Sequence, residues 1–247
     1  MVGDEFTKNL SIENDPRVKQ TFSAEEEADF SNINSLIEKN VNRNTKVVYI
    51  DLIRYEFIWM DIFRDMDEGP KVIKMLLNVD LNSLMQTVHY RSTDLASKFP
   101  KTRFIWCLPY PIDFLAFNLK SLNSHGCNDY DSDDIRAWSS LSKAFFLKIK
   151  EIKKIWDANY KTIEYINLNE LFFKDATEKD FIHGINIFEK SFENNEGNFN
   201  WPKNGTNDGI NLTSYKRSIF KSSFLNNLAK ELKGLQSQNS QGKVRNM

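Results

Sequence analysis

Three short segments combine glycine with carboxylate or amide residues, which are residue types that hydrolytic sites use. They are Gly3-Asp4-Glu5, the Gly-Cys-Asn-Asp stretch at 126–129 and the Asp-Gly-Ile-Asn stretch at 208–211. Asp208 could orient a general base placed three residues further on, but Asn211 occupies that position. Because an amide has no basic nitrogen, Asn211 cannot take a proton from a hydroxyl near neutral pH. The residues of these segments therefore do not form an intact catalytic set.

The order of these segments resembles the signature of the SGNH hydrolase family, which runs Gly-Asp-Ser, a lone Gly, Gly-x-Asn-Asp and Asp-x-x-His. The resemblance covers the second half of the chain only, where a strand, a helix and a strand are followed by "DGINLTSYKRSIFKSSFL". It implies a shared fold and an inactive site, since Glu5 replaces the serine nucleophile and Asn211 replaces the histidine base. The context fits less well. We expect no strand before Gly3, and 126–129 lie well past the nearest predicted strand.

A second group of polar residues follows the predicted strands. Ligands of open α/β sheets bind at the carboxyl ends of parallel strands. The residues expected there are Asp51, Arg54, Tyr110, Asp113, Asn167 and Glu170. They could form an acidic metal or sugar site, although such residues more often cap helices and close loops. His89, His125 and His183 are scattered without the spacing of a zinc site, so we expect no metal and no cofactor.

The elements that would position these residues are strands alternating with helices. Runs at 46–53, 102–109 and 161–168 are rich in β-branched and aromatic residues and are bounded by polar residues or proline, as buried strands are. Helical patterns fill the intervals, with one or two helices over 71–99. The pattern predicts a predominantly α-helical α/β fold, in which long helices surround a small, mainly parallel sheet of about three strands.

The clearest helix begins at Asp133 and Asp134, whose carboxylates favour a helix start. Its apolar positions recur every three or four residues: Trp138, Leu141, Phe145, Ile149, Ile152 and Trp156. The lysines from Lys148 to Lys154 alternate with these positions, and we interpret them as a solvated helix face. Ser23 with Glu26 forms a capping box for a helix reaching about Lys39. A last amphipathic helix is expected from Leu212 to Leu232, with Gly234 as its C-cap.

Composition limits the possible functions. The 247 residues are 40% hydrophobic and carry a net charge of −1, so we expect a folded core and no long-range attraction to nucleic acid or an anionic membrane. The N-terminus lacks the pattern of a secretory signal, and no apolar run approaches the ~20 residues of a membrane span. We therefore expect an intracellular protein.

The two ends of the chain are polar and show no core-seeking pattern. We expect an extended N-terminal arm over 1–22, a single helix-rich domain over 23–234 and a polar tail over 235–247. Such ends fray unless something holds them, and exchange between copies is a simple way to hold them. The interpretation is a self-assembling protein, its partners being further copies of itself with terminal arms exchanged.

In size and character the chain is similar to the occlusion-body proteins, or polyhedrins, of insect viruses, in particular the helix-rich nudivirus type. The chain is rich in the Asn, Lys, Ile and Phe of A/T-rich codons, which insect viruses often use. The resemblance implies a non-enzymatic matrix protein that embeds virions in an intracellular crystal and dissolves in alkali. Tyrosines titrating near pH ~10 and lysines near ~10.4 would make lattice contacts repulsive there. The alternative is a degenerate SGNH-like hydrolase.

The two cysteines are too few for a disulfide scaffold. Cys107 closes a predicted strand and should be buried and inert. Cys127 lies in a polar loop and could form an intermolecular disulfide, although an isolated surface thiol is the commoner case.

Overall fold

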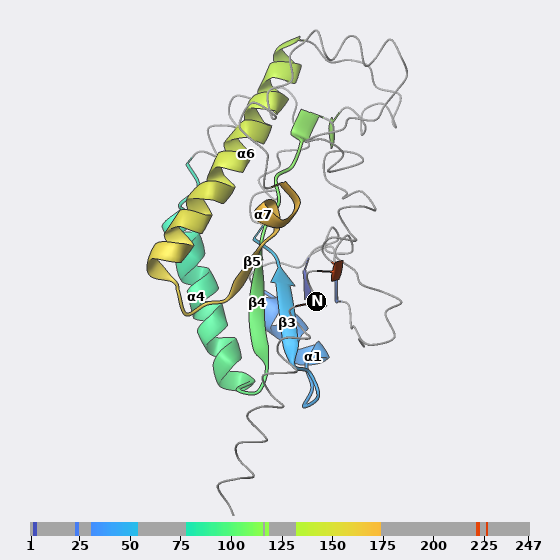
Figure 1. Cartoon of the computed structure of the whole chain (residues 1–247), viewed down its shortest axis with the longest axis vertical. Coiled ribbons are helices and arrows are strands. Elements are labelled where there is room, and N and C mark those ends of the chain that lie inside the picture. Colours follow the sequence, from blue (N-terminus) through green and yellow to red (C-terminus); the bar gives the residue numbers. More distant parts are fainter. Residues whose placement is uncertain are drawn as a thin grey trace, which may run out of the picture.

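A computed structural model describes residues 2–3, 23–24, 31–53, 78–115, 117–118, 132–173, 221–222 and 226. Its centre is a parallel sheet whose strands lie in the order β2-β1-β3-β4-β5 (Figure 1). The strands are β1 (Val2–Gly3), β2 (Ser23–Ala24), β3 (Val47–Asp51), β4 (Arg103–Leu108) and β5 (Tyr165–Asn167). The three predicted strands and their parallel arrangement are confirmed.

Two predictions near the N-terminus are wrong. Gly3 was expected to follow no strand, but it ends β1, which lies between β2 and β3. Ser23 was expected to cap a helix, but Ser23 and Ala24 form β2 and pair with β1. Both strands have two residues, too few to show an alternating pattern in sequence. Pairing with a neighbouring strand, which local sequence does not encode, therefore decides their conformation.

The helices are α1 (Ile33–Asn40), α4 (Leu81–Lys98), α6 (Ser132–Asn159) and α7 (Leu168–Phe173). α4 begins where the Asp80 carboxylate accepts hydrogen bonds from the backbone amides of Asn82 and Ser83, at 3.0 and 3.2 Å. It ends just before Pro100, as predicted. α6 carries Asp133 and Asp134 in its first turn, where carboxylates offset the helix dipole.

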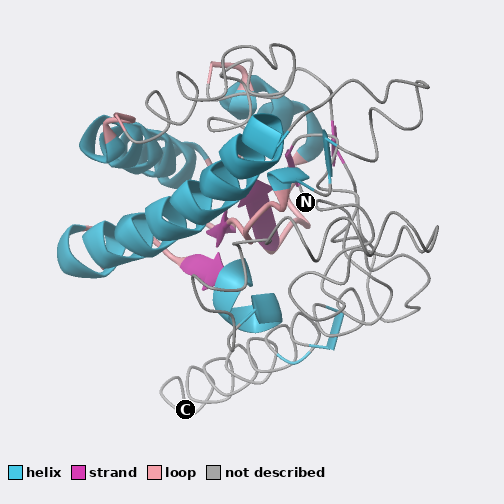
Figure 2. Cartoon of the chain, turned by 90° about the horizontal axis from the view of Figure 1, so that it is seen from above, coloured by secondary structure: helices cyan, strands magenta, loops and turns pink. Residues whose placement is uncertain are grey.

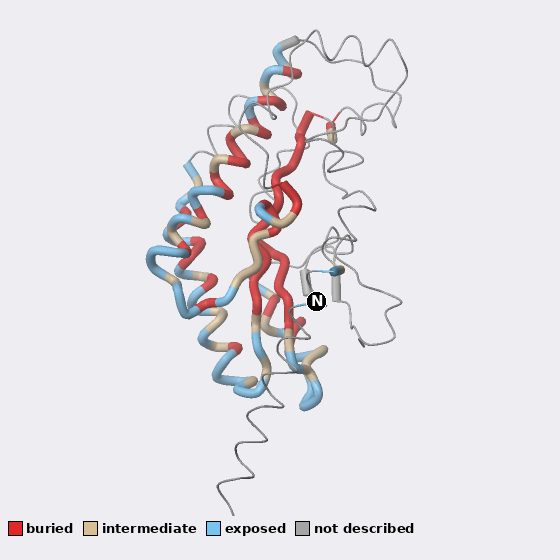
Figure 3. The backbone as a smooth tube through the Cα atoms, in the orientation of Figure 1, coloured by how far each residue is buried: buried red, intermediate tan, exposed pale blue. Residues whose placement is uncertain are grey.

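One face of the sheet packs against the long helices (Figures 1 and 2). Val48 and Ile50 of β3 and Trp106 and Leu108 of β4 join buried side chains of α1, α4 and α6 in one core cluster. The apolar stripe predicted for α6 is confirmed, because its members are at most 5% exposed: Trp138, Leu141, Phe145, Ile149, Ile152 and Trp156. Figure 3 shows the buried backbone running through the strands and along the inner side of α6.

The opposite face of the sheet carries a second, smaller cluster. Tyr49, Ile105 and Cys107 pack there with Phe172 and Phe173 of α7. Because helices contribute to a core on each face, the sheet is the middle layer of an α/β sandwich. No described helix is long and apolar enough to cross a membrane.

The interpretation of the lysines at 148–154 as a solvated face needs one correction. Lys148 is only 8% exposed, and its Nζ lies 3.1 Å from Glu151 Oε2. Its ammonium group is therefore partly desolvated and paired, as a nearly buried charge must be. Lys150 and Lys154 are exposed, as predicted.

Several predictions fall on residues outside the described ones. They include the arm over 1–22 apart from Val2 and Gly3, and the tail over 235–247. Of the last predicted helix, Lys221, Ser222 and Asn226 are helical, and its expected core-facing residues and Gly234 lie outside the described part of the chain.

Candidate functional site

The carboxyl edge of the sheet contains the topological switch point. The order β2-β1-β3 means that the chain leaves β1 toward one side and returns on its other side. Gly3 and Asp51, the last residues of β1 and β3, are register partners at that point. In open α/β sheets the crevice for a ligand lies outside the carboxyl ends of the two strands that flank the switch point. The ends of β1 and β3 are therefore the first place to look for a site.

The end of β3 is fully buried. Asp51 is 0% exposed, and so are Leu52 and Ile53, which follow it. Asp51 thus lies where the sequence predicted a strand-end carboxylate, whereas its expected companion Arg54 is outside the described residues. A carboxylate taken out of water at this position is costly unless its surroundings compensate it. The switch point therefore has a buried carboxylate, Asp51, next to Gly3.

The end of β4 is a buried segment in which predicted site residues serve packing. Tyr110 and Asp113 are both fully buried. The Tyr110 ring meets the ring of Phe172 edge-on at 6.0 Å, and the ring of Phe173 lies 6.1 Å away. The carbonyl oxygen of Asp113 accepts a 3.0 Å hydrogen bond from the Phe117 amide, which opens a helical turn. Tyr110 therefore holds α7 against β4.

Ser142 of α6 is a polar contact of this segment that the sequence did not predict. Its hydroxyl oxygen accepts a 2.9 Å hydrogen bond from the backbone amide of Phe114. The same hydroxyl donates to the carbonyl oxygen of Trp138, one turn earlier in α6, at 3.0 Å. The contact could have been suspected from the sequence, because Ser142 lies inside the predicted apolar stretch of α6 and a buried hydroxyl requires a hydrogen-bond partner.

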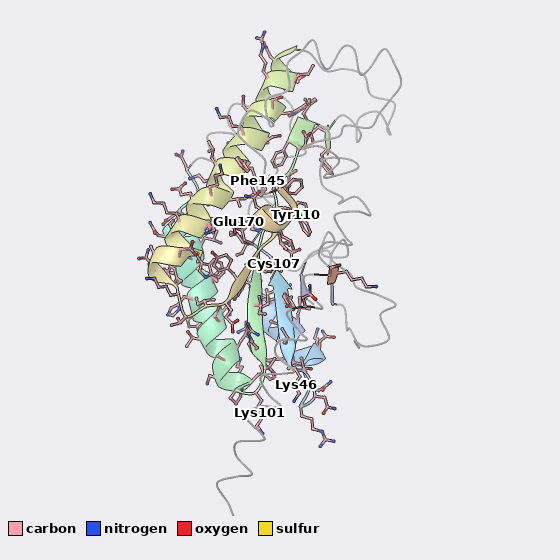
Figure 4. All side chains as sticks on the ribbon, viewed as in Figure 1. Lys46, Lys101, Cys107, Tyr110, Phe145 and Glu170 are labelled. Carbon is pink, nitrogen blue, oxygen red and sulfur yellow. The ribbon has the colours of Figure 1, made fainter. Side chains whose placement is uncertain are left out.

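At the end of β5, the predicted site residues cap a helix. Asn167 Oδ1 accepts a 3.1 Å hydrogen bond from the backbone amide of Glu170, in the first turn of α7. Glu170 is exposed, and its Oε1 lies 3.7 Å from Lys153 Nζ. Asn167 therefore caps α7, which is the commoner role that the sequence left open, whereas the Glu170 side chain lies near Lys153. Figure 4 shows Glu170 and Tyr110 together toward this end of the sheet.

Asn169 is a residue of the same edge that the sequence did not single out. It is 8% exposed, and its Oδ1 accepts no hydrogen bond from the described residues. A buried amide oxygen without a donor costs free energy, so such an atom calls for an explanation. It gives the carboxyl edge an acceptor that a bound molecule could use.

Tyr49 lies two residues before Asp51 on the second face of the sheet. Burial raises the pKa of its phenol to about 12, helped by the neighbouring Cys107 and opposed by Arg103. Burial, followed by the hydrogen bond to Asp157, also raises the pKa of Tyr165 to about 12. The sequence expectation that tyrosines titrate near pH ~10 is thus wrong for these two, because burial raises both pKa values and Asp157 adds to the rise at Tyr165.

Most of the other predicted site residues lie outside the described part of the chain. Asp4, Glu5, the segment 126–129 with Cys127, and both Asp208 and Asn211 lie outside the described residues. Cys107 is buried, as predicted. His89 is exposed on α4, where its ring lies 5.7 Å from that of Tyr160. No three His, Cys, Asp or Glu side chains of the described part gather as metal ligands.

The strand order and the buried switch point define an open, parallel α/β protein of the 2-1-3-4-5 type. Comparison with family models, with curated proteins and with solved structures found no match.

Proposed function

We propose that the chain is a degenerate hydrolase that resembles the SGNH hydrolases in fold. The site at its strand ends binds a ligand but does not catalyse hydrolysis. The observation that supports this is the position of Gly3 at the carboxyl end of β1, paired with Asp51 of β3. The Gly-Asp-Glu segment that resembles Gly-Asp-Ser therefore begins at the switch point, where α/β proteins bind ligands. The sequence context had argued against the resemblance, because no strand was expected before Gly3. The position of Gly3 at the end of β1 removes that argument.

Residue chemistry argues against turnover at this site. A serine hydrolase needs a hydroxyl nucleophile beside a base that takes its proton. The sequence has Glu5 where the resemblance implies the serine and Asn211 where it implies the histidine. Among the described residues, the histidine His89 lies on α4 in a groove at the amino ends of the strands. It therefore cannot replace the missing base at the switch point.

A hydrolysis assay tests the proposal. The unaltered protein should hydrolyse p-nitrophenyl acetate no faster than buffer, whereas Glu5→Ser/Asn211→His should exceed the buffer rate. The matched control Glu38→Ser/Asn42→His makes the same two changes at exposed positions of α1 and the following loop. Turnover by the unaltered protein that is lost in Asp208→Ala would contradict the non-catalytic function. Equal, background rates for both double variants would remove the support for an SGNH-like site.

Self-assembly into a viral occlusion body remains a prediction from the polar chain ends. Val2 and Gly3, which belong to the expected arm, are hydrogen-bonded into the sheet of their own chain. These two residues are thus not available for exchange while that pairing holds. The size distribution of the protein at neutral and strongly alkaline pH would test this alternative, which requires large particles that dissolve in alkali.

A further inference from the structure

The amino ends of the central strands present a group of basic side chains, which we call the basic edge. Its members are Lys39, Arg43, Lys46, Lys101 and Lys161. They come from the end of α1 and from the loops that precede β3, β4 and β5. Neighbouring strands lie about 4.8 Å apart, so these loops are adjacent. Two hydrogen bonds join the segments at the starts of β3 and β4. The Arg103 amide donates to the Lys46 carbonyl oxygen at 2.9 Å, and the Thr102 hydroxyl donates to the Thr45 carbonyl oxygen at 3.1 Å.

The charges of the basic edge are not neutralised within the described structure. All five side chains are exposed, and none forms an ion pair with a described residue. The nearby carboxylates are already engaged. Glu38 and Asp94 lie 2.8 and 3.1 Å from Lys98 Nζ, and Glu164 accepts hydrogen bonds from the Arg103 guanidinium. The edge therefore carries an excess of positive charge, although the whole chain has a net charge of −1.

Helix ends explain only part of this charge. The carbonyl ends of helices attract cations, and Lys39 and Lys98 lie in the last turns of α1 and α4. Lys46 and Lys101 lie in the loops beyond those turns, each one or two residues before a strand. Figure 4 shows these two lysines together at the end of the sheet opposite Tyr110 and Glu170. The effect of a helix dipole is confined to the last turn, so it does not account for them.

A groove of about 570 Å³, with both polar and apolar walls, adjoins the basic edge between α4 and the turn before β5. Lys101 and Arg103 line it together with the hydroxyl-bearing residues Thr93 and Thr162. His89 also lines the groove, and its ring contacts that of Tyr160. Hydroxyl and cationic groups contact phosphates, and exposed rings stack on bases. Tyr90, the next residue along α4, is 67% exposed and adds another ring on this helix.

We propose that the basic edge binds single-stranded nucleic acid, with phosphates along Lys46 and Lys101 and a base against the His89 ring. Unpaired cations, hydroxyls and an accessible ring beside one groove are the combination that single strands use. An acidic protein could pair with the cations of the basic edge, but it would have no planar base to stack on the His89 ring. The sequence predicted no nucleic-acid partner from the net charge of the whole chain. That sum does not show the local excess of positive charge at the basic edge. This proposal concerns the edge opposite the switch point and does not depend on the function proposed above.

Fluorescence anisotropy with a labelled 12-nucleotide oligouridylate tests it. Lys46→Glu/Lys101→Glu should weaken binding at least tenfold. Each lost phosphate contact should reduce the slope of log K against log salt by about 0.7, hence by about 1.4 for the pair. The matched control Lys150→Glu/Lys154→Glu reverses two exposed lysines of α6 and should bind like the unaltered protein. Lys46→Gln/Lys101→Gln gives a milder change, and unfolding midpoints confirm that each variant is folded.

A His89→Ala variant separates stacking from charge, because it should weaken binding severalfold without changing the salt slope. Labelled oligothymidylate shows whether the strand must be RNA. The proposal is overturned if the two charge-reversed pairs bind equally. It is also overturned if polyglutamate of equal charge competes as well as oligouridylate, or if the protein binds phosphatidylserine vesicles but not the oligonucleotide.

Discussion

The indole nitrogen of Trp156 donates a 3.0 Å hydrogen bond to the carbonyl oxygen of Ile163. This bond connects the last part of α6 to the turn that leads into β5. The Trp156 ring also lies 4.9 Å from the ring of Tyr165, the first residue of β5. The reversal from helix to strand is therefore set by one buried side chain, which is 1% exposed.

Trp156→Phe should destabilise the protein by about 1–3 kcal/mol, because the Ile163 carbonyl oxygen loses its donor in a buried place. Trp156→Ala should cost about 3–5 kcal/mol, because a cavity is added. Denaturant unfolding measures both values. Tyr90→Phe, which changes an aromatic side chain that is 67% exposed, is the control and should change stability by less than about 0.5 kcal/mol. Equal stability of all three variants would show that the bond has no structural role.

Ser142→Ala should destabilise the protein by about 1–3 kcal/mol, because the buried Phe114 amide would lose its acceptor. The matched control is Ser140→Ala, two residues earlier in α6. The Ser140 side chain is exposed and donates to the carbonyl oxygen of Arg136. Its removal should be neutral or slightly stabilising, since such back-bonding serines weaken helices. A similar loss in both variants would assign the effect to α6 itself and not to the contact with Phe114.

Stability should fall as the pH rises from about 10 to about 12. The pKa of Tyr49 is raised to about 12 by burial, so the unfolded chain releases this proton first. The contribution of Tyr49 is fully present below pH ~10 and is lost as the pH passes through 12, for a total of about 2–3 kcal/mol. Unfolding free energies at pH 9 and 11.5 measure this loss. Tyr49→Phe should lose correspondingly less over the same range, and an identical loss would contradict the assignment to Tyr49.

The Cys107 thiol should react with Ellman's reagent only after unfolding, because it is 0% exposed. Cys127→Ser leaves Cys107 as the single thiol of the chain. Its reaction should be slower by orders of magnitude in neutral buffer than in 6 M guanidinium chloride. Fast reaction of the folded variant would mean that the β4 region opens readily.

The central part of the fold follows from local sequence. β3 and β4 could be predicted because nearly every position is apolar, which is typical of strands buried on both faces. α6 could be predicted because six apolar residues share one face of a 28-residue helix. In both cases a single periodicity extends over enough residues to be unambiguous.

The site was less predictable because it depends on contacts between distant parts of the chain. β1 has two residues and exists through pairing with β3, which lies more than forty residues further on. Ser23 and Glu26 fit a capping box, yet Ser23 pairs with Val2. The basic edge is likewise spread over loops far apart in sequence, so only the parallel alignment of the strands brings its charges to one side.

β4 pairs with β3 over Arg103–Trp106 and with β5 over Trp106–Leu108, so only Trp106 has a register partner on each side. Exposing the whole of β4 to solvent therefore requires two ladders to separate, whereas β5 pairs only with β4 among the described strands. In deuterated buffer, the amide protons of Ile105, Trp106 and Cys107 should be among the last of the described residues to exchange, at a rate that reports global unfolding. The exchange rate of β4, which lies between β3 and β5, thus measures the free energy of unfolding of the whole molecule.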